Sequence, residues 1–166
     1  MKSGIIIYPR QGRNNFPTPF MDLKKTYQLI KEIYLEDNKP LLVGYSGGKD
    51  SSATLQAIWF SLWQLPKEQL TKNIWVISSN TLVENPIVEK WQRQSLEAMQ
   101  VAAREQRLPI RVKVLTPAIK DTFWVKVIGS GYAVPRRTFR WCTTRLKIRA
   151  SNSFIKEIIR KMVRLS

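Results

Sequence analysis

Residues 41–52 read LLVGYSGGKDSS, a short apolar run followed directly by a loop of serine, glycine and lysine. The apolar run from Leu41 to Tyr45 is typical of a strand that is buried on both faces, as in a parallel sheet. A helical pattern of apolar residues starts near Asp50 and continues to about Leu65. We therefore expect loop 46–52 to join the end of a strand to the start of a helix.

Loop 46–52 has the composition of an anion-binding site. A helix start offers unpaired N–H groups and the positive end of the helix dipole. Two glycines let the backbone approach an anion, three serines add hydroxyl groups, and Lys49 adds a positive charge. Together they predict a cradle for phosphate or pyrophosphate. A tight turn capped by Asp50 is the simpler alternative, but a turn does not require serine, two glycines and lysine together.

Two common phosphate-binding motifs are excluded. The Walker loop needs glycine where this chain has Val43, and serine or threonine where it has Asp50. The dinucleotide fingerprint GxGxxG does not occur either.

Strand and helix patterns alternate along the rest of the chain. We predict helices over 19–37, 50–65, 86–107, 121–128 and 146–163, and strands over 41–45, 74–77 and 110–115. This alternation predicts an α/β fold with a mainly parallel sheet, in a single domain over 19–166 that follows an irregular arm over 1–18. Because doubly wound sheets usually continue into further strands, we expect this chain to be part of a longer protein.

Positive charge is the most unusual bulk property of the sequence. The 166 residues carry 28 Lys and Arg against 12 Asp and Glu, a formal net charge of +16. Residues 136–166 alone hold ten of the basic side chains and one acidic one. A solvated basic face is one explanation. The aromatic residues Phe139 and Trp141 among the arginines favour a polyanion partner instead, although we expect both rings to lie in the core.

Composition also excludes several classes of site. The chain has no histidine and one cysteine, Cys142, so it lacks a Ser-His-Asp triad, a disulfide framework and a multi-cysteine metal site of its own. No apolar run reaches the ~18 residues of a membrane span. The N-terminus lacks the apolar core of a signal peptide. We therefore expect a cytoplasmic protein without a membrane partner.

The motif SGGKDS over 46–51 resembles the signature of the PP-loop ATP pyrophosphatases, which include phosphoadenylylsulfate reductases and tRNA-thiolating enzymes. Three further stretches, ISSNTLVENP over 77–86, DTFW over 121–124 and RRTFRWCTTRLKI over 136–148, make most of the chain similar to the DndC sulfurtransferases of bacterial DNA phosphorothioation. The resemblance implies the three-layer fold of the adenine nucleotide alpha-hydrolase type. It also implies that ATP adenylylates a DNA backbone phosphate, whose non-bridging oxygen is then replaced by sulfur.

The resemblance implies a set of partners and site residues. ATP and Mg²⁺ are the expected cofactors, and DNA, a cysteine desulfurase and other proteins of the phosphorothioation system are the expected partners. Nucleotide binding is assigned to Ser46, Gly47, Gly48, Lys49, Asp50, Ser51, Ser52 and Thr81. Binding of the DNA phosphate is assigned to Arg136, Arg137, Arg140, Arg145 and Lys147, and catalysis to Lys49, Asp50, Arg140 and Arg145.

Two metal-binding roles are also expected. Glu84 is a candidate for holding Mg²⁺ through water, although a carboxylate in the first turn of a helix has a purely structural explanation as well. Relatives usually have Asp where this chain has Asn80, so direct metal binding there is weakened. The arginines around Cys142 favour its thiolate, although a lone cysteine is often an inert packing residue. In the family this cysteine ligates an iron–sulfur cluster with further cysteines, which this chain does not contain.

Two other functions remain open from the sequence. One is a phosphoadenylylsulfate reductase-like enzyme that acts on a small sulfonucleotide, with the basic segment holding its second phosphate or sulfate. The other is a non-catalytic nucleic-acid-binding module whose phosphate loop is a relic. The concentration of charge in residues 136–166 favours a larger polyanion over a small sulfonucleotide.

Overall fold

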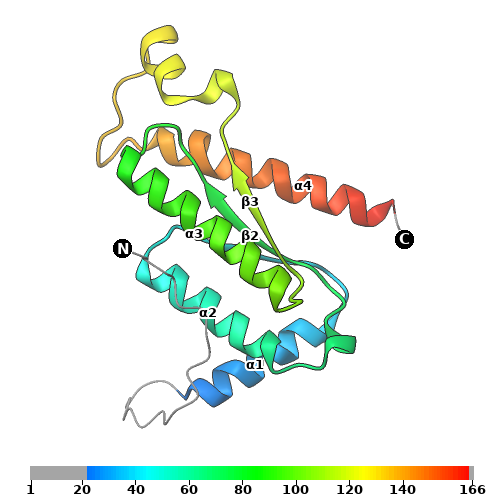
Figure 1. The fold of residues 1–166 in the computed structure, drawn as a ribbon. Helices are drawn as coiled ribbons and strands as arrows, with labels where there is room; N and C mark the ends of the chain where they lie inside the picture. Colours follow the sequence, from blue (N-terminus) through cyan, green and yellow to red (C-terminus); the bar gives the residue numbers. More distant parts are fainter. Residues whose placement is uncertain (1–21, 165–166) are drawn as a thin grey trace. The chain divides into compact units, whose positions relative to one another are not determined.

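The computed structural model describes residues 22–164. It is an α/β structure with a three-stranded parallel sheet in the order β1-β2-β3, an arrangement compatible with a three-layer α/β fold (Figure 1). The strands are β1 (Leu41–Gly44), β2 (Ile74–Ser79) and β3 (Ile110–Leu115), and the helices are α1 (Leu23–Glu36), α2 (Lys49–Trp63), α3 (Pro86–Glu105) and α4 (Arg149–Val163). The predicted N-terminal arm lies outside the described residues.

The chain forms two compact units. The first contains the described residues up to Val76 together with Gln92–Val112, and the second contains Ile77–Trp91 and the residues from Lys113 onward. The single domain expected from chain length stays a prediction.

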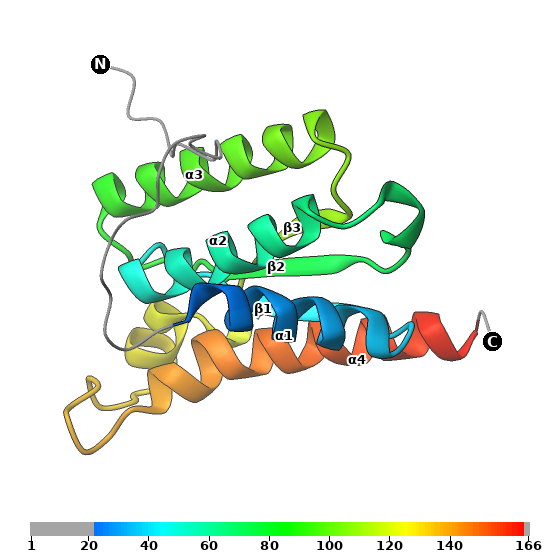
Figure 2. The same ribbon diagram turned by 90° about the horizontal axis from the view of Figure 1, so that it is seen from below.

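The core of the first unit lies between the sheet and two helices. Alternate residues of β2, Ile74 and Val76, are fully buried, and they share one hydrophobic cluster with Ile110 of β3. Side chains of α2 and α3 complete this cluster, so these helices cover one face of the strands. The first helix, α1, packs against α2 (Figure 2) and adds the buried ring of Tyr34.

Local signals explain where the helices begin and end. Asp22 caps α1, because its carboxylate accepts hydrogen bonds from the backbone N–H groups of Lys24 and Lys25. Pro86 occupies the first position of α3, where no N–H is needed. At its other end, Arg107 takes a left-handed backbone with φ 53°, and Leu108 N–H bonds to the Ala103 carbonyl. This turn directs the chain from α3 straight into β3.

The second unit departs from the predicted pattern in two places. The helix predicted over 121–128 is present in another form: residues 123–129 are helical and end in the π-helical segment Val125–Gly129, while Asp121 belongs to a preceding 3₁₀ turn, Ile119–Asp121. The last helix begins before the predicted residue 146, because a π-helical segment, Thr143–Ile148, leads directly into α4.

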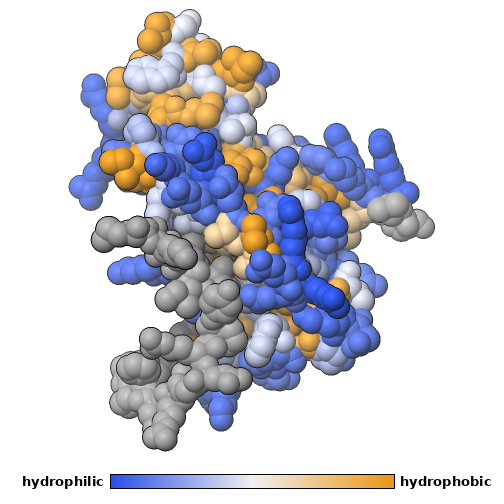
Figure 3. All heavy atoms as spheres, in the orientation of Figure 1, coloured by the Kyte–Doolittle hydropathy of each residue, from blue (hydrophilic) through white to orange (hydrophobic). Residues whose placement is uncertain are grey.

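Exposed apolar side chains gather between β3 and α4. Figure 3 shows this apolar surface at the top of the view, over the segment that Figure 1 draws in yellow. Ile119 is 82% exposed and Ile128 is 78% exposed, with Trp124 and Val134 at 59% each. No helix of the described part of the chain is both long and apolar enough to span a bilayer.

Candidate functional site

The phosphate loop, residues 46–52, lies where the sequence predicts it, between the end of β1 and the start of α2. Gly47 has a φ of 78°, a left-handed conformation that glycine adopts without steric cost. Gly48 is the N-cap of α2 and makes no side-chain cap bond. The first amide that bonds back along the chain is that of Ser52, to the Gly48 carbonyl at 3.0 Å. The amides of Lys49, Asp50 and Ser51 precede it and have no intrahelical partner.

Serine hydroxyls fix the shape of the loop. Ser51 Oγ donates to the Gly48 carbonyl at 3.0 Å and lies 3.2 Å from Ser46 Oγ. The Ser46 backbone N–H donates to Ser51 Oγ at 3.4 Å. These bonds close the loop on itself and hold its glycines at the start of α2. These internal hydrogen bonds fix the conformation of the loop.

The charged residues of the loop are open to solvent. Lys49 and Asp50 are both exposed, as are Ser46 and Gly48. An exposed lysine beside free helix amides is the chemical composition of a phosphate site, because the amides give fixed donors and the lysine gives a mobile charge. Residues 46–52 are thus brought together by the structure.

The loop that follows β2 belongs to the second unit and is tightly organised. Thr81 is buried, and its hydroxyl donates to Glu84 Oε1 at 2.9 Å. Asn80 accepts from the Leu82 N–H at 2.8 Å and donates through its amide to Glu89 Oε1 at 3.0 Å. Leu82 has a φ of 64°, which is rare for a residue with a branched side chain. The role of Thr81 in binding nucleotide stays a prediction.

Glu89 was not singled out from the sequence. It lies nine residues from Asn80 on the first turns of α3, and only the fold brings its carboxylate to the Asn80 amide. The only signal in the sequence was the position of Glu89 in the first turn of a helix. A carboxylate at that position is already explained by the helix dipole, so it does not indicate a site.

The arginine-rich segment forms a tight turn. Arg136 and Phe139 exchange two backbone hydrogen bonds, N–H of Arg136 to the Phe139 carbonyl at 3.1 Å and the reverse bond at 3.0 Å. Arg136, Arg137 and Arg140 are exposed around this turn. Lys147 is also exposed, on the π-helical segment that follows. Three predicted phosphate-binding arginines therefore present their charge to solvent from one short turn.

Arg145 has a different environment from the other predicted arginines. Its guanidinium donates to Asp121 Oδ1 at 2.9 Å and to the Tyr132 hydroxyl at 2.8 Å, and it packs over the Tyr132 ring. Arg149 also donates to Asp121, at 3.3 Å. Asp121 and Arg149 were not assigned roles from the sequence. The pairing joins two stretches that the family resemblance had marked separately, 121–124 and 136–148.

The buried carboxylate of Asp121 is stabilised by these arginines. Burial by itself would raise the pKa of Asp121, but the hydrogen bonds and positive charges of Arg145 and Arg149 outweigh it and hold that pKa below its usual value. The charge of Arg145 is therefore partly compensated within the protein. Its direct contact with a DNA phosphate stays a prediction.

The two aromatic residues of the segment have opposite environments. Trp141 is buried, stacks on Phe123 with ring centroids 5.8 Å apart, and donates its indole N–H to the Ala133 carbonyl at 2.9 Å. Trp141 thus belongs to the core as expected. Phe139 is 49% exposed, so the expectation that it is a core residue is wrong. It sits at the end of the tight turn that its backbone bonds to Arg136 close.

Cys142 is a free, partly buried cysteine that precedes the π-helical segment. Within residues 22–164 the structure shows no group of three or more Cys, His, Asp or Glu side chains arranged to hold a metal ion. The predicted roles of Cys142 and Glu84 as metal ligands stay predictions.

Comparison with known proteins finds one curated relative of note. An uncharacterized protein of Methanocaldococcus jannaschii is 30% identical to this chain over 136 residues. The match covers 81% of this chain and 22% of the archaeal protein, so the chain spans about a fifth of the length of the relative. The sequence matches no protein-family model and no solved structure.

Proposed function

We propose that this chain is a PP-loop type nucleotide-binding domain that uses ATP to adenylylate a DNA backbone phosphate for sulfur transfer. The observation that carries the proposal is the internally hydrogen-bonded loop between β1 and α2. There, a left-handed glycine, three amides at a helix start and an exposed lysine lie together. This is the arrangement that binds the phosphates of a nucleotide. The family resemblance of residues 46–51 supports ATP as that nucleotide.

The chemistry consists of two displacements at phosphorus. A non-bridging oxygen of the DNA phosphate attacks the α-phosphorus of ATP, and pyrophosphate leaves. A sulfur nucleophile, supplied by a cysteine desulfurase with a thiol reductant, then attacks the DNA phosphorus, and AMP leaves with the original oxygen. The loop would hold the leaving pyrophosphate, with Lys49 and the helix amides neutralising the charge that develops on it.

The basic turn of the second unit supports DNA as the acceptor. Arg136, Arg137 and Arg140 are exposed, and arginine binds phosphate oxygens in a bidentate manner. Lys147 adds a fourth exposed charge. Arg145, held by Asp121, is assigned a positioning role for this segment rather than a first contact with substrate.

Of the two expected metal-containing cofactors, Mg²⁺ and an iron–sulfur cluster, the residues of this chain fit only Mg²⁺. Glu84 has a carboxylate oxygen fixed by Thr81, and Mg²⁺ usually needs only one or two carboxylates beside the phosphates of a nucleotide. An iron–sulfur cluster does not fit this chain alone, because it takes about four thiolates and the sequence has one cysteine. We therefore assign no step of the reaction to a cluster here.

Isotope exchange between pyrophosphate and ATP, measured with and without DNA, tests the proposal. Adenylylation is reversible, so label should pass from pyrophosphate to ATP only when DNA is present. Lys49→Ala should abolish the exchange, because it removes a charge-assisted contact that contributes about 1.5–3 kcal/mol. Lys39→Ala, which removes an exposed lysine outside the loop, is the matched control.

The outcomes separate the alternatives. Exchange that is absent with DNA but appears with a small sulfonucleotide would replace the proposal with the reductase-like function. Binding of DNA without any exchange, in the presence of ATP and Mg²⁺, would leave a nucleic-acid-binding module. Equal exchange by Lys49→Ala and the unaltered protein would show that the loop is purely structural.

A further inference from the structure

A pocket of about 500 Å³ lies in the first unit at the opposite end of the sheet from the phosphate loop. It is lined by residues just before and within the first halves of β2 and β3, and by the last turns of α3. The phosphate loop follows the carboxyl end of β1, and the strands are parallel. The usual ligand position of an open α/β sheet is that carboxyl end, so this pocket is a separate feature. Its volume is within the usual range for ligand sites.

The lining combines positive charge with amides and a large ring. Among the described residues that line it, two are arginines, Arg104 and Arg111, and none is acidic. Neither arginine forms an ion pair with a residue that the structure describes. The Arg111 guanidinium packs over the Trp75 ring, 5.7 Å from its centroid. The side-chain amides of Asn73 and Gln100 add hydrogen-bond donors and acceptors.

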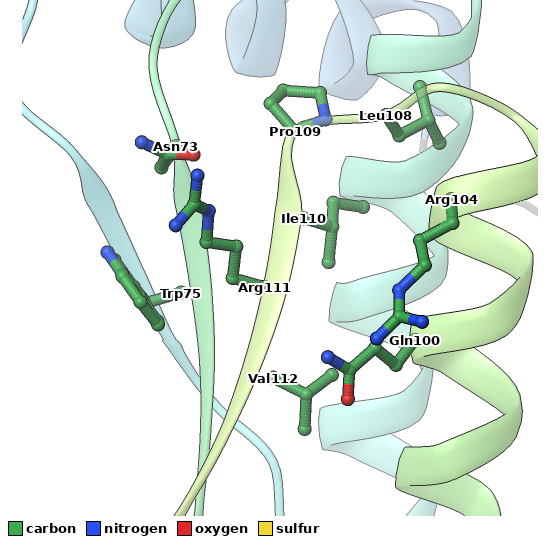
Figure 4. Close-up of a pocket in the computed structure, with 9 residues that line it drawn as sticks. All are labelled: Asn73, Trp75, Gln100, Arg104, Leu108, Pro109, Ile110, Arg111 and Val112. Carbon is green, nitrogen blue, oxygen red and sulfur yellow. The ribbon is translucent and has the colours of Figure 1, made fainter.

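The polar side chains that line the pocket lie on both sides of β3. Figure 4 shows that Arg111 extends from β3 across β2, toward Asn73 and Trp75. The same view shows Arg104 on α3 with its guanidinium beside Gln100, on the other side of β3. A ligand that contacts both groups has to cross β3, which is one of the two edge strands of the sheet in the described part of the chain. That favours an extended chain over a compact small molecule.

We propose that this pocket binds a segment of single-stranded nucleic acid. One base stacks against the Trp75–Arg111 pair, and a backbone phosphate binds Arg104 beside Gln100. Aromatic rings and arginine planes bind bases of any sequence by stacking, and arginines bind the phosphates between them. The net charge of +16 favours such a polyanion. The site goes beyond the proposed function, because binding here needs neither ATP nor its cleavage.

Fluorescence anisotropy of a labelled single-stranded oligonucleotide, with no ATP and with a chelator present, tests the site. Arg104→Gln should weaken binding and reduce the slope of log affinity against log salt by about 0.7, because it removes the phosphate contact. Arg111→Gln should weaken binding with little change in that slope, because it removes a stacking partner of the base. Trp75→Leu should weaken binding about tenfold, while Trp75→Phe, which keeps a ring, should retain most of the affinity. Arg93→Gln, which removes an exposed arginine of α3 outside the pocket, is the matched control and should bind normally. Circular dichroism confirms that each variant is folded.

Three further measurements decide the ligand and separate the two proposals. Affinity should rise from thymidine monophosphate to a short oligonucleotide, and equal affinities would overturn the assignment of a strand. An extended acidic peptide that binds where the oligonucleotide does not would also overturn it. Lys49→Ala should bind the oligonucleotide normally, so loss of ATP chemistry leaves this site intact. If folded Arg104, Arg111 and Trp75→Leu variants all bind like the unaltered protein, the pocket is not the site.

Discussion

At the scale of single residues, the left-handed backbone at position 47 explains why the phosphate loop has a glycine there. With a φ of 78°, position 47 is strained for any residue with a Cβ atom, by about 1–2 kcal/mol. We expect Gly47→Ala to lower the free energy of unfolding by about that amount and to abolish ATP binding. Chemical denaturation and calorimetric titration with ATP measure the two effects.

Gly48 provides the control for this prediction. Its φ is −76°, and an added Cβ would meet only Ser46 Oγ, at 3.5 Å, an ordinary contact distance. Gly48→Ala should therefore fold with almost unchanged stability. Equal losses of stability in the two variants would contradict the argument that backbone conformation makes the difference.

A buried polar network joins α1 to the loop that precedes β2. The Tyr34 hydroxyl donates to the Lys72 carbonyl at 2.8 Å and accepts from the Lys72 N–H at 3.2 Å. Lys72 Nζ donates to the Ile33 carbonyl and to the Asp37 carboxylate, both at 3.1 Å. Burial raises the pKa of Tyr34, so its hydroxyl stays protonated and able to donate.

Removing this hydroxyl should destabilise the first unit. Tyr34→Phe leaves a buried N–H and a buried carbonyl without their partner, so we expect the free energy of unfolding to fall by about 1–3 kcal/mol. Tyr27→Phe keeps the ring that contacts Phe60 and should change stability by less than about 0.5 kcal/mol. Urea denaturation of both variants is the measurement. A Tyr34→Phe protein as stable as the control would show that water replaces the lost bonds.

At the scale of elements, Asp121 links a 3₁₀ turn to the last helical stretch of the chain. Its carboxylate holds Arg145 and Arg149, which flank the junction between the π-helical segment and α4. Its pKa is lower in the folded protein than in the unfolded chain. The stability that it contributes is therefore fully present above the unfolded value of about 3.9. It is lost as pH falls through the lower folded pKa.

Asp121→Asn tests this link. At neutral pH the change should cost about 1.5–3 kcal/mol, because hydrogen bonds between charged groups are lost. As pH falls below about 4, the unaltered protein should lose stability while the variant loses less, so the two curves converge. Unfolding by urea at a series of pH values measures this. Parallel curves would mean that another carboxylate governs the acid sensitivity.

Elements whose signals are local were predictable from the sequence. Strand β3 begins and ends at the predicted residues, because the alternation of apolar and basic residues from Ile110 to Leu115 has the period of a strand. The start of α3 was marked by Pro86. The helix predicted over 121–128 starts at residue 123 and is mostly π-helical. The Asp121 carboxylate bonds to arginines 24 and 28 residues away, and no local periodicity reveals such partners.

The candidate site shows the same division. The phosphate loop was predictable because strand, glycines and helix start are adjacent in sequence. The pairing of the Arg145 side chain was not predictable, since its partners Asp121 and Tyr132 come from other segments. The exposure of Phe139 depends on the backbone bonds of a turn whose residues carry no glycine or proline signal.

At the scale of the whole molecule, the distribution of charge makes a testable statement about DNA. Residues 136–166 carry ten basic side chains and one acidic one, and Asp121 compensates part of that charge at Arg145 and Arg149. Three exposed arginines of this segment, none of which forms an ion pair with a described residue, lie together at the turn of Arg136, Arg137 and Arg140. If DNA binds here, this turn and not the total charge should set the salt dependence of binding.

Replacing all three arginines of the turn with glutamine should separate the attraction of DNA by this turn from its attraction by the net charge of the protein. The turn is closed by main-chain bonds between Arg136 and Phe139, so the substitutions leave its backbone partners intact. Each lost duplex phosphate contact should reduce the slope of log affinity against log salt by about 0.9. A control variant with three lysines elsewhere replaced, at positions 24, 39 and 90, removes the same charge and should leave the slope nearly unchanged. Equal slopes in the two variants would mean that DNA is attracted by the net charge as a whole. The slope reports how many DNA phosphates the protein neutralises, wherever the neutralising cations lie.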